Sequence, residues 1–229
     1  MQQGNRENQD NIASIVWEAA HDLLQAGLGK EGRPRFLLGI TGSPAAGKST
    51  FSALLAAALN KLIGKEIAIV VPMDGFHLPN TVLEERGLRP LKGIPETFDA
   101  KKFIELLERL RRDLAEKILC PIYDREQLDD RVENAIEVEP SKRIIIIEGN
   151  YLLLDDPPWD QARHKLDQVW YLDAPREITE KRLVQRHMDG GRNLDQAIKK
   201  VEETDLPNTS LIEKTRIYAD KIVKLSDAG

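Results

Sequence analysis

The chain has 229 residues, of which 41% are hydrophobic and 31% charged, and its formal net charge is −5. This length suits one α/β domain, and the acidic balance disfavours a nucleic-acid-binding protein, because phosphate backbones attract basic surfaces. A single cysteine, Cys120, excludes an internal disulfide framework and suits a reducing cytoplasm. The polar start of the chain lacks a signal-peptide core, and no apolar run is long enough for a membrane span. We therefore expect a cytoplasmic protein without membrane or nucleic-acid partners.

The first third of the chain predicts a polar tail, a helix and a βαβ unit. Residues 1–10 are expected to fray, and residues 12–28 have apolar side chains at helical spacing. Residues 36–41 form a short apolar run before a glycine-rich turn, residues 48–62 are alanine-rich and helical in pattern, and residues 66–71 are β-branched. The order of strand, turn, helix and strand predicts a parallel sheet.

The remaining elements extend this pattern into one domain over residues 1–229. Residues 80–98 predict a loop over the sheet edge, on the acceptor side, and Asp99 is expected to cap the next helix. Residues 121–140 are mixed, with a short strand at 135–138. The other expected elements are helix 100–117, a central strand beginning at Arg143, strand 168–175, helices 176–188 and 193–203, and a last strand at 219–225. The expected fold is α/β, with a doubly wound parallel sheet and helices on both of its faces.

The stretch "GSPAAGKS" fits the phosphate-loop pattern G-x-x-x-x-G-K-[ST]. Glycines let the backbone curl so that successive N–H groups face phosphate oxygens, and the following helix aims its N-terminus at the same place. The lysine can reach the β- and γ-phosphates, and the serine can bind Mg²⁺. The alternative is a glycine turn without a ligand. The pattern predicts a nucleotide site at Gly42, Ser43, Pro44, Ala45, Ala46, Gly47, Lys48, Ser49 and Thr50.

Two carboxylates follow predicted strands, where ligands of open parallel sheets bind. Asp74 comes after strand 66–71, expected beside the strand of the phosphate loop, and could accept a proton from a substrate hydroxyl or position a metal-bound water. Its alternative is a turn-capping role in Asp-Gly. Glu148 ends a run of four isoleucines and is a candidate Mg²⁺ ligand together with Ser49. Its alternative is an exposed strand end.

A movable flap over the triphosphate is predicted for residues 182–193. Arg182 and Arg186 share one helix face, and Arg192 follows the hinge-like pair Gly190-Gly191. Arginines on such a flap could neutralise transition-state charge, and the alternative is a solvated basic face. His77 could touch substrate or phosphate, although a single loop histidine is more often structural.

The phosphate loop and the stretches "PMDGFH", "PETFDA", "PIYDR", "IEGNYLLL" and "QRHMDGG" occur in this order between residues 36 and 208. The set resembles the P-loop small-molecule kinases that include uridine kinase, phosphoribulokinase and bacterial pantothenate kinase. It is most similar to a subgroup described as fructose transport system kinases. The resemblance implies ATP and Mg²⁺ as cofactors and a small-molecule acceptor, and it leaves a homodimer and the choice between ATP and GTP open.

The resemblance also implies roles for particular residues. Asp74 matches the catalytic or metal-organising aspartate, and Glu148 matches the acid of a modified Walker B strand. Arg182 and Arg186 match lid arginines with a catalytic role, and Arg186 also a nucleotide-binding one. The residues expected near the acceptor are Asp74, His77, Asp99, Tyr123, Asp124 and Glu148.

One departure bears on the acceptor. After "PIYD" the chain continues "REQLDDR", where uridine kinase has a histidine or aromatic stretch that holds the pyrimidine. This disfavours a nucleoside base and suits a smaller polar acceptor. Arg125 or Arg131 could bind an anionic acceptor, and pairing with nearby acids is an equal alternative.

The functional hypothesis is an ATP-dependent transfer of phosphate to a hydroxyl of a small polar metabolite, with a sugar favoured. The alternatives are a uridine/cytidine or pantothenate kinase and, from another class, a nucleotide-dependent switch or assembly factor. A nucleic-acid-processing ATPase is disfavoured by the acidic charge balance.

Overall fold

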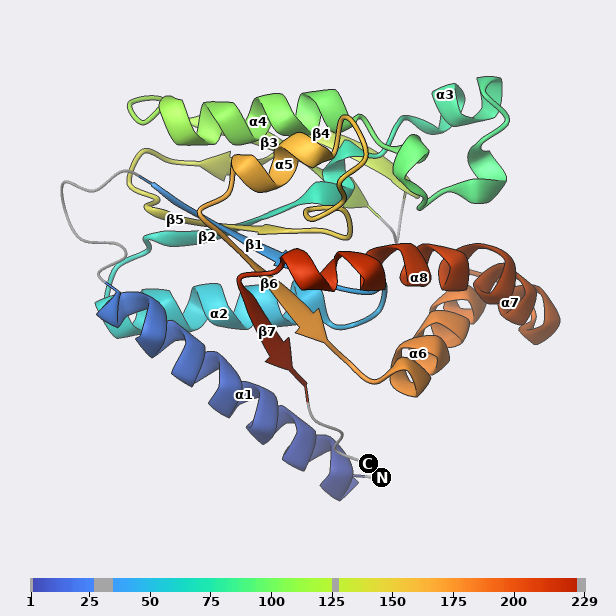
Figure 1. Cartoon of the computed structure of the whole chain (residues 1–229), viewed down its shortest axis with the longest axis horizontal. Coiled ribbons are helices and arrows are strands. Elements are labelled where there is room, and N and C mark those ends of the chain that lie inside the picture. Colours follow the sequence, from blue (N-terminus) through green and yellow to red (C-terminus); the bar gives the residue numbers. More distant parts are fainter. Residues whose placement is uncertain (1, 27–34, 125–127, 226–229) are drawn as a thin grey trace.

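A parallel sheet forms the centre of the molecule. The computed structural model describes residues 2–26, 35–124 and 128–225, and side chains from residue 12 onward. Helices cover both faces of the sheet, as the sequence predicted (Figure 1). The five-stranded sheet has the order β2-β5-β1-β6-β7, and every neighbouring pair is parallel. Its strands are β1 (Phe36–Thr41), β2 (Ala68–Pro72), β5 (Ile144–Glu148), β6 (Gln168–Asp173) and β7 (Lys221–Lys224).

Strand β5 lies between β1 and β2 and is buried on both faces. Ile144 pairs with Phe36 of β1 on one side and with Ala68 of β2 on the other. The four isoleucines from Ile144 to Ile147 are fully buried. A continuous apolar run is the pattern of a strand covered on both faces, which explains why this central strand could be predicted.

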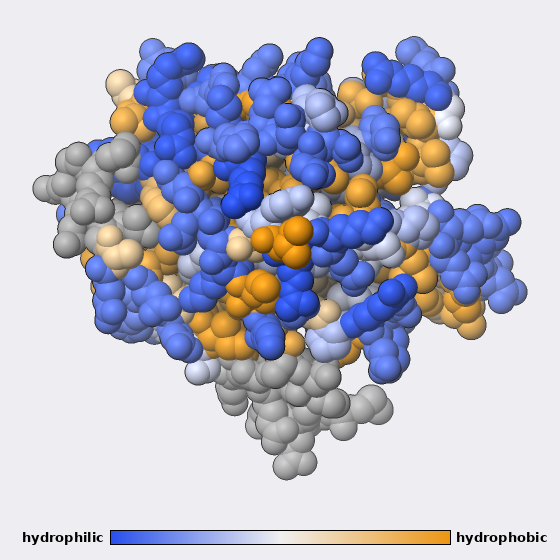
Figure 2. All heavy atoms as spheres, viewed as in Figure 1, coloured by the Kyte–Doolittle hydropathy of each residue, from blue (hydrophilic) through white to orange (hydrophobic). Residues whose placement is uncertain are grey.

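Each face of the sheet has its own core. On one face, α1 (Gln2–Gln25) packs on α2 (Lys48–Ile63), with Val16 and Leu23 of α1 in one buried cluster with Phe51 and Leu55 of α2. On the other face lie α4 (Ala100–Arg112) and α5 (Asp160–His164), where Phe103 packs against Trp159. The outer surface above α4 is largely hydrophilic (Figure 2), as an amphipathic covering helix requires.

Two helix boundaries differ from the prediction. Residues 2–10 are helical instead of a frayed tail, since α1 begins already at Gln2. No proline interrupts these first turns, so the helix can extend through them. The helix ends at Gln25, and residues 27 and 28 lie outside the described residues. Helix α4 ends at Arg112, five residues earlier than predicted, because its last buried residue is Leu110 and the chain turns at Asp113 into the next strand.

Residues 118–138 form an antiparallel hairpin of β3 (Ile118–Asp124) and β4 (Asp130–Val138). The predicted strand at 135–138 is the second half of β4, whereas the first half of β4 and the whole of β3 were not predicted. Pro121 hid β3, since proline removes a ladder N–H, and the register shifts between Cys120 and Ile122. Gly75 brings the hairpin close to the sheet, because a Cβ there would lie only 2.3 Å from the Pro121 carbonyl oxygen.

Residues 80–98 also differ from the predicted loop. They contain α3 (Asn80–Glu85) and two 3₁₀ turns, η2 (Arg89–Leu91) and η3 (Pro95–Thr97). Prolines start both turns, because their fixed φ suits the first helical positions.

The C-terminal helices lie beside the carboxyl ends of β1 and β6 (Figure 1). They are α6 (Arg176–Asp189), α7 (Leu194–Lys200), a π-helical segment η4 (Val201–Asp205) and α8 (Leu206–Lys214). The predicted helix 176–188 matches α6. The predicted helix 193–203 is divided between α7, which a capping box at Asn193 and Gln196 starts, and η4.

Replacing the buried Arg35 should destabilise the fold. Its guanidinium donates to the carbonyl oxygens of Leu110, Asp113, Glu139 and Lys142 at 3.0–3.3 Å, and burial lowers its pKa. Arg35→Leu leaves these acceptors without their donor, so we expect the free energy of unfolding to fall by about 3 kcal/mol. Urea unfolding measures the loss, with the exposed Arg112→Leu as control. Equal stability of the two variants would contradict this role.

The only cysteine should be chemically inert in the folded protein. Cys120 is fully buried in β3, and burial raises the pKa of its thiol to about 12. Since the thiolate is the reactive form, we expect no reaction with a thiol reagent at mildly alkaline pH and a full reaction in denaturant. Rapid labelling of the native protein would show that β3 opens readily.

Candidate active site

The phosphate loop joins β1 to α2 at the carboxyl end of β1. Gly42 and Gly47 have φ values of +145° and +94°, and Ala45 has a φ of +61°. At Gly42 a Cβ would lie 2.5 Å from the carbonyl oxygen of Leu172, so the close approach of β6 excludes any side chain. The "GSPAAGKS" stretch therefore has a tightly curled backbone followed directly by a helix N-terminus, the arrangement that binds phosphates.

Lys48 folds back over this loop. Its Nζ atom donates to the carbonyl oxygens of Gly42 and Ser43, both at 2.9 Å, and the residue is only 8% exposed. Ser43 belongs to the same loop and is buried, with its Oγ 3.3 Å from the Tyr171 hydroxyl. Burial raises the pKa of Tyr171. The loop thus holds its lysine at the cleft before any ligand arrives.

Ser49, in the first turn of α2, and Glu148, at the end of β5, lie next to each other at the carboxyl end of the sheet. The Ser49 hydroxyl donates to Glu148 Oε1 at 3.0 Å, because β5 pairs directly with β1 and Glu148 ends β5. Glu148 is 8% exposed, and the next residue, Gly149, packs against Met73 with no room for a Cβ. A hydroxyl and a carboxylate at this spacing suit Mg²⁺, which takes few protein ligands besides phosphate oxygens and water. Among the described residues, no group of three or more His, Cys, Asp or Glu side chains forms a metal cage.

Asp74 lies in the short turn η1 (Met73–Phe76) that follows β2. The sequence suggested a place beside the strand of the phosphate loop, and this detail was wrong, because β5 lies between β2 and β1. Strand order is set by long-range pairing, which local patterns do not encode. Asp74 and Glu148 nevertheless line the same cleft at the same end of the sheet.

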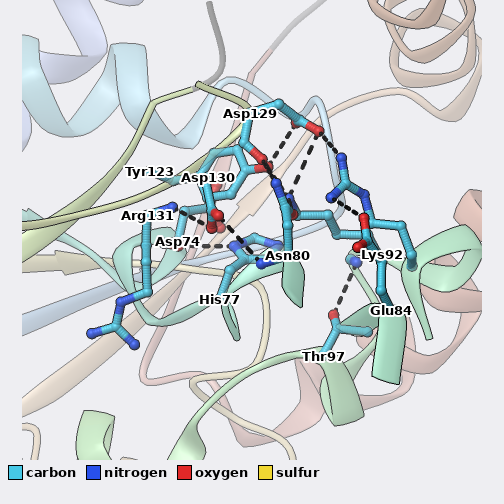
Figure 3. Close-up of polar contacts among 12 residues, drawn as sticks. Asp74, His77, Asn80, Glu84, Lys92, Thr97, Tyr123, Asp129, Asp130 and Arg131 are labelled. Carbon is cyan, nitrogen blue, oxygen red and sulfur yellow. Dashed lines mark hydrogen bonds and ion pairs between the residues drawn. The ribbon is translucent and has the colours of Figure 1, made fainter. Parts of the chain in front are cut away.

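His77 is buried within an aromatic cluster. Its ring lies 3.9 Å from the Phe98 ring and 4.6 Å from the Tyr123 ring, and its Nδ1 is 2.8 Å from the backbone carbonyl oxygen of Asp74. Figure 3 shows His77 between Asp74 and the polar groups of the hairpin. His77, Phe98 and Tyr123 line the cleft together. The histidine therefore packs in the wall and fixes the turn that carries Asp74.

A cleft of 1110 Å³ joins these parts. Its other wall carries the predicted flap, in which Arg182 donates to the carbonyl oxygen of Ala45 at 3.3 Å. The flap residues that line the cleft are Arg182, Arg186, His187, Gly190, Gly191 and Arg192.

Three residues that the sequence suggested for the acceptor side do not line the cleft. Asp99 caps α4 by accepting from the backbone N–H of Lys102 at 3.2 Å, and it lines a separate pocket. Asp124 ends β3 and does not line the cleft. The side chain of Arg131 is 9% exposed and pairs with Glu133, and Arg125 lies outside the described residues.

Five charged residues that the sequence did not single out line the cleft. They are Arg89, Lys92, Asp129, Lys200 and Asp205. The only sequence signal was a pair of cations within "RGLRPLKG", a stretch that reads as an ordinary solvated turn. Asp129 and Lys200 gave no signal, because only the folded chain brings them to this wall.

Fold and site together define the class, a P-loop phosphotransferase with a phosphate loop, acidic strand ends and an arginine-bearing flap. The sequence model of the phosphoribulokinase/uridine kinase family matches residues 37–227, so the chain belongs to this family. The chain is thus a small-molecule kinase by family, as the sequence resemblance predicted. Within the described residues, no helix is long and apolar enough to cross a membrane.

Three known proteins illustrate the relationship. A protein of Schizosaccharomyces pombe, provisionally described as a uridine kinase, is 35% identical over 196 residues, covering 83% of each chain. The pantothenate kinase of Vibrio cholerae is 30% identical over 185 residues, covering 78% of this chain and 58% of its own length. A solved structure from Silicibacter sp. TM1040, provisionally described as a fructose transport system kinase, has a TM-score of 0.81 and 41% identity, covering 91% of this chain and 98% of its own.

Proposed function

We propose that the protein transfers the γ-phosphate of ATP to a hydroxyl of a small polar metabolite, with a sugar or sugar-like acceptor favoured. The observation that carries the proposal is the single cleft in which Asp74 lies with the phosphate loop and with the ring-lined wall of His77, Phe98 and Tyr123. A switch that binds only a nucleotide would not need the cleft to extend past the phosphate loop to this second wall.

At the nucleotide end, the loop amides and Lys48 bind the triphosphate. The lysine is already held at the loop by two carbonyl oxygens, so binding requires only that its Nζ atom turn from these oxygens toward the phosphates. Ser49 and Glu148, already within hydrogen-bond distance of each other, would hold Mg²⁺, directly or through water. When bound, this ion neutralises charge on the phosphates.

At the acceptor end, Asp74 accepts or orients the proton of the attacking hydroxyl. The contact of His77 Nδ1 with the Asp74 carbonyl oxygen holds the backbone of the turn that carries this carboxylate. Arg182 and Arg186 close over the transferring group from the flap. Transfer then depends on positioning and charge neutralisation, which these residues supply without a covalent intermediate.

A coupled assay of ADP release with Mg-ATP tests the proposal. The acceptors are fructose and other hexoses, gluconate, sugar phosphates, glycerate, uridine, cytidine, pantothenate and panthenol, and the control contains no acceptor. One acceptor that raises ADP release well above the control, with a phosphorylated product seen by mass spectrometry, supports the proposal. Slow, acceptor-independent release across the whole panel would favour a nucleotide-dependent switch. Uridine, cytidine or pantothenate as the acceptor would select an alternative kinase activity in the same family.

A further inference from the structure

The cleft is basic although the chain is acidic. Seven Lys and Arg side chains and four carboxylates line it among the described residues, whereas the whole chain has a net charge of −5. The triphosphate accounts for Lys48, Arg182 and Arg186, and Arg192 lies on the same flap, where its Nη1 is 3.3 Å from His187 Nδ1. The triphosphate does not account for Arg89, Lys92 and Lys200, because these three meet at the 89–93 segment, which adjoins Tyr123 on the acceptor wall.

The 89–93 segment is held rigidly from behind. The Gly93 carbonyl oxygen accepts from the hydroxyl of Tyr151 and from Asn208 Nδ2, and the Tyr151 hydroxyl oxygen also lies 2.8 Å from Asn208 Oδ1. The Gly93 N–H donates to the fully buried Thr97 hydroxyl at 3.0 Å. Lys200 donates to the Pro90 carbonyl oxygen at 2.6 Å. Buried, satisfied polar groups of this kind fix the segment in one place, so its cations need little reordering to bind a ligand.

Arg89 and Lys92 already surround a carboxylate. Asp129 Oδ2 is 3.1 Å from Arg89 Nη2 and 3.8 Å from Lys92 Nζ, and Asp129 Oδ1 accepts from the Tyr123 hydroxyl at 2.7 Å. Figure 3 shows Lys92, Tyr123 and Asn80 directed at Asp129. The side chain of Lys92 is 13% exposed, whereas that of Asp129 is 60% exposed. Lys92 is therefore set into the wall, whereas Arg89 is 35% exposed and also pairs with Glu84 at 3.5 Å. The Asp129 carboxylate between them faces solvent.

We propose that the acceptor carries an anionic group, a carboxylate or a phosphate ester, and that Arg89 and Lys92 bind this group where the Asp129 carboxylate now lies. Lys200 adds a third positive charge behind the same segment. The inference rests on the proposed function, and it narrows the acceptor from a polar metabolite to an anionic one. It also transfers the anion-binding role considered for Arg131 to residues that line the cleft.

The rival explanation is that Arg89 and Lys92 only hold Asp129, which would itself bind the hydroxyls of a neutral sugar. The hydrogen bonds of Asp129 argue against this. Its carbonyl oxygen accepts from Asn80, Lys92 and Tyr123, and both carboxylate oxygens already face donors. Each carboxylate oxygen of Asp129 is already held by a hydrogen bond from the wall, whereas Arg and Lys can exchange one anion for another.

Matched acceptors test the inference. Fructose and fructose 6-phosphate differ only in a phosphate ester, and panthenol and pantothenate differ only in an alcohol in place of a carboxylate. We expect an anionic member to exceed its neutral partner in kcat/KM by at least tenfold, and comparing carboxylate with phosphate identifies the group. A neutral acceptor that is used as well as its anionic partner overturns the inference but leaves the proposed function intact. Absence of acceptor-dependent ADP release across the panel rejects both.

Variants locate the anion. Arg89→Gln and Lys92→Gln should raise the KM of the anionic acceptor about 10- to 100-fold while the KM for ATP changes less than about twofold. Arg86→Gln is the matched control, because Arg86 is exposed, lies in the same region and does not line the cleft. Asp129→Asn should not raise the KM of the acceptor, because it removes the carboxylate that competes with the acceptor's anionic group. Asparagine can adopt the positive φ of 46° at this position, so the backbone should be unchanged. A rise in Asp129→Asn equal to that in Arg89→Gln, or an unchanged KM in both cation variants, overturns the inference.

Discussion

Replacing Asp74 with asparagine is expected to lower kcat for acceptor phosphorylation about a thousandfold. Asparagine has nearly the same shape, so the turn η1 and its contact with His77 should persist, but an amide cannot take the proton of the attacking hydroxyl. Nucleotide affinity should stay within about twofold of wild type, because the phosphate loop follows β1 and Asp74 follows β2, with β5 between them. Steady-state kinetics with the acceptor found in the panel measure the first effect. Titration with a non-hydrolysable ATP analogue measures the second.

Asp99→Asn is the matched control for this experiment. It makes the same chemical change at a residue that caps α4 and lies outside the cleft, and asparagine is an equally good capping residue. We expect its kcat and its stability to equal those of wild type. If Asp74→Asn kept full activity, the role assigned to Asp74 would be wrong. If Asp99→Asn also lost activity, the acceptor site would have to extend beyond the cleft to Asp99.

Replacing Lys48 with methionine is expected to reduce kcat/KM for ATP by at least about a hundredfold. Methionine keeps the length and packing of the stem but removes the charge that would contact the phosphates. The loop itself should remain folded, because its curl depends on Gly42 and Gly47 and on the packing of β6 against Gly42. Thermal unfolding without ligand should therefore be nearly unchanged, whereas the stabilisation that Mg-ATP gives to wild type should be lost.

The control for Lys48→Met is Lys65→Met. Lys65 is exposed just beyond the C-terminal end of α2, the helix that Lys48 begins. The same loss of one positive charge there should change neither ATP affinity nor turnover, because the charge lies about a full helix length from the phosphates. If Lys48→Met retained stabilisation by Mg-ATP, the nucleotide would lie elsewhere in the cleft.

Local chemistry made the nucleotide side of the site readable from the chain. The spacing of Gly42, Gly47, Lys48 and Ser49 along the chain is enough to predict the loop, because the consecutive backbone amides that bind phosphate need no distant partner. The isoleucines before Glu148 carried their own signal, since a strand buried on both faces must be apolar throughout. The βαβ unit then required that Ser49 and the acidic strand ends lie at one edge of the sheet.

The acceptor side could not be derived in this way. Asp99 and Asp124 lie in family-like stretches, yet the structure places one at a helix cap and the other at a hairpin end outside the cleft. Arg89, Lys92, Asp129 and Lys200 lie in stretches that read as solvated turns or helix surface, yet they meet on one wall. Strand β3 was hidden by Pro121 because its pairing with β4 is a contact between segments, not a property of either one.

The sequence by itself determined the phosphate loop, the parallel α/β class and the kinase family, because each depends on residues close together in the chain or on a fixed order of motifs. Only the tertiary structure decided that β5 separates Asp74 from the phosphate-loop strand and that three cations converge on the 89–93 segment. The physical reason is that strand order and the shape of the acceptor wall come from contacts between distant segments, and these contacts are selected by packing of the whole chain.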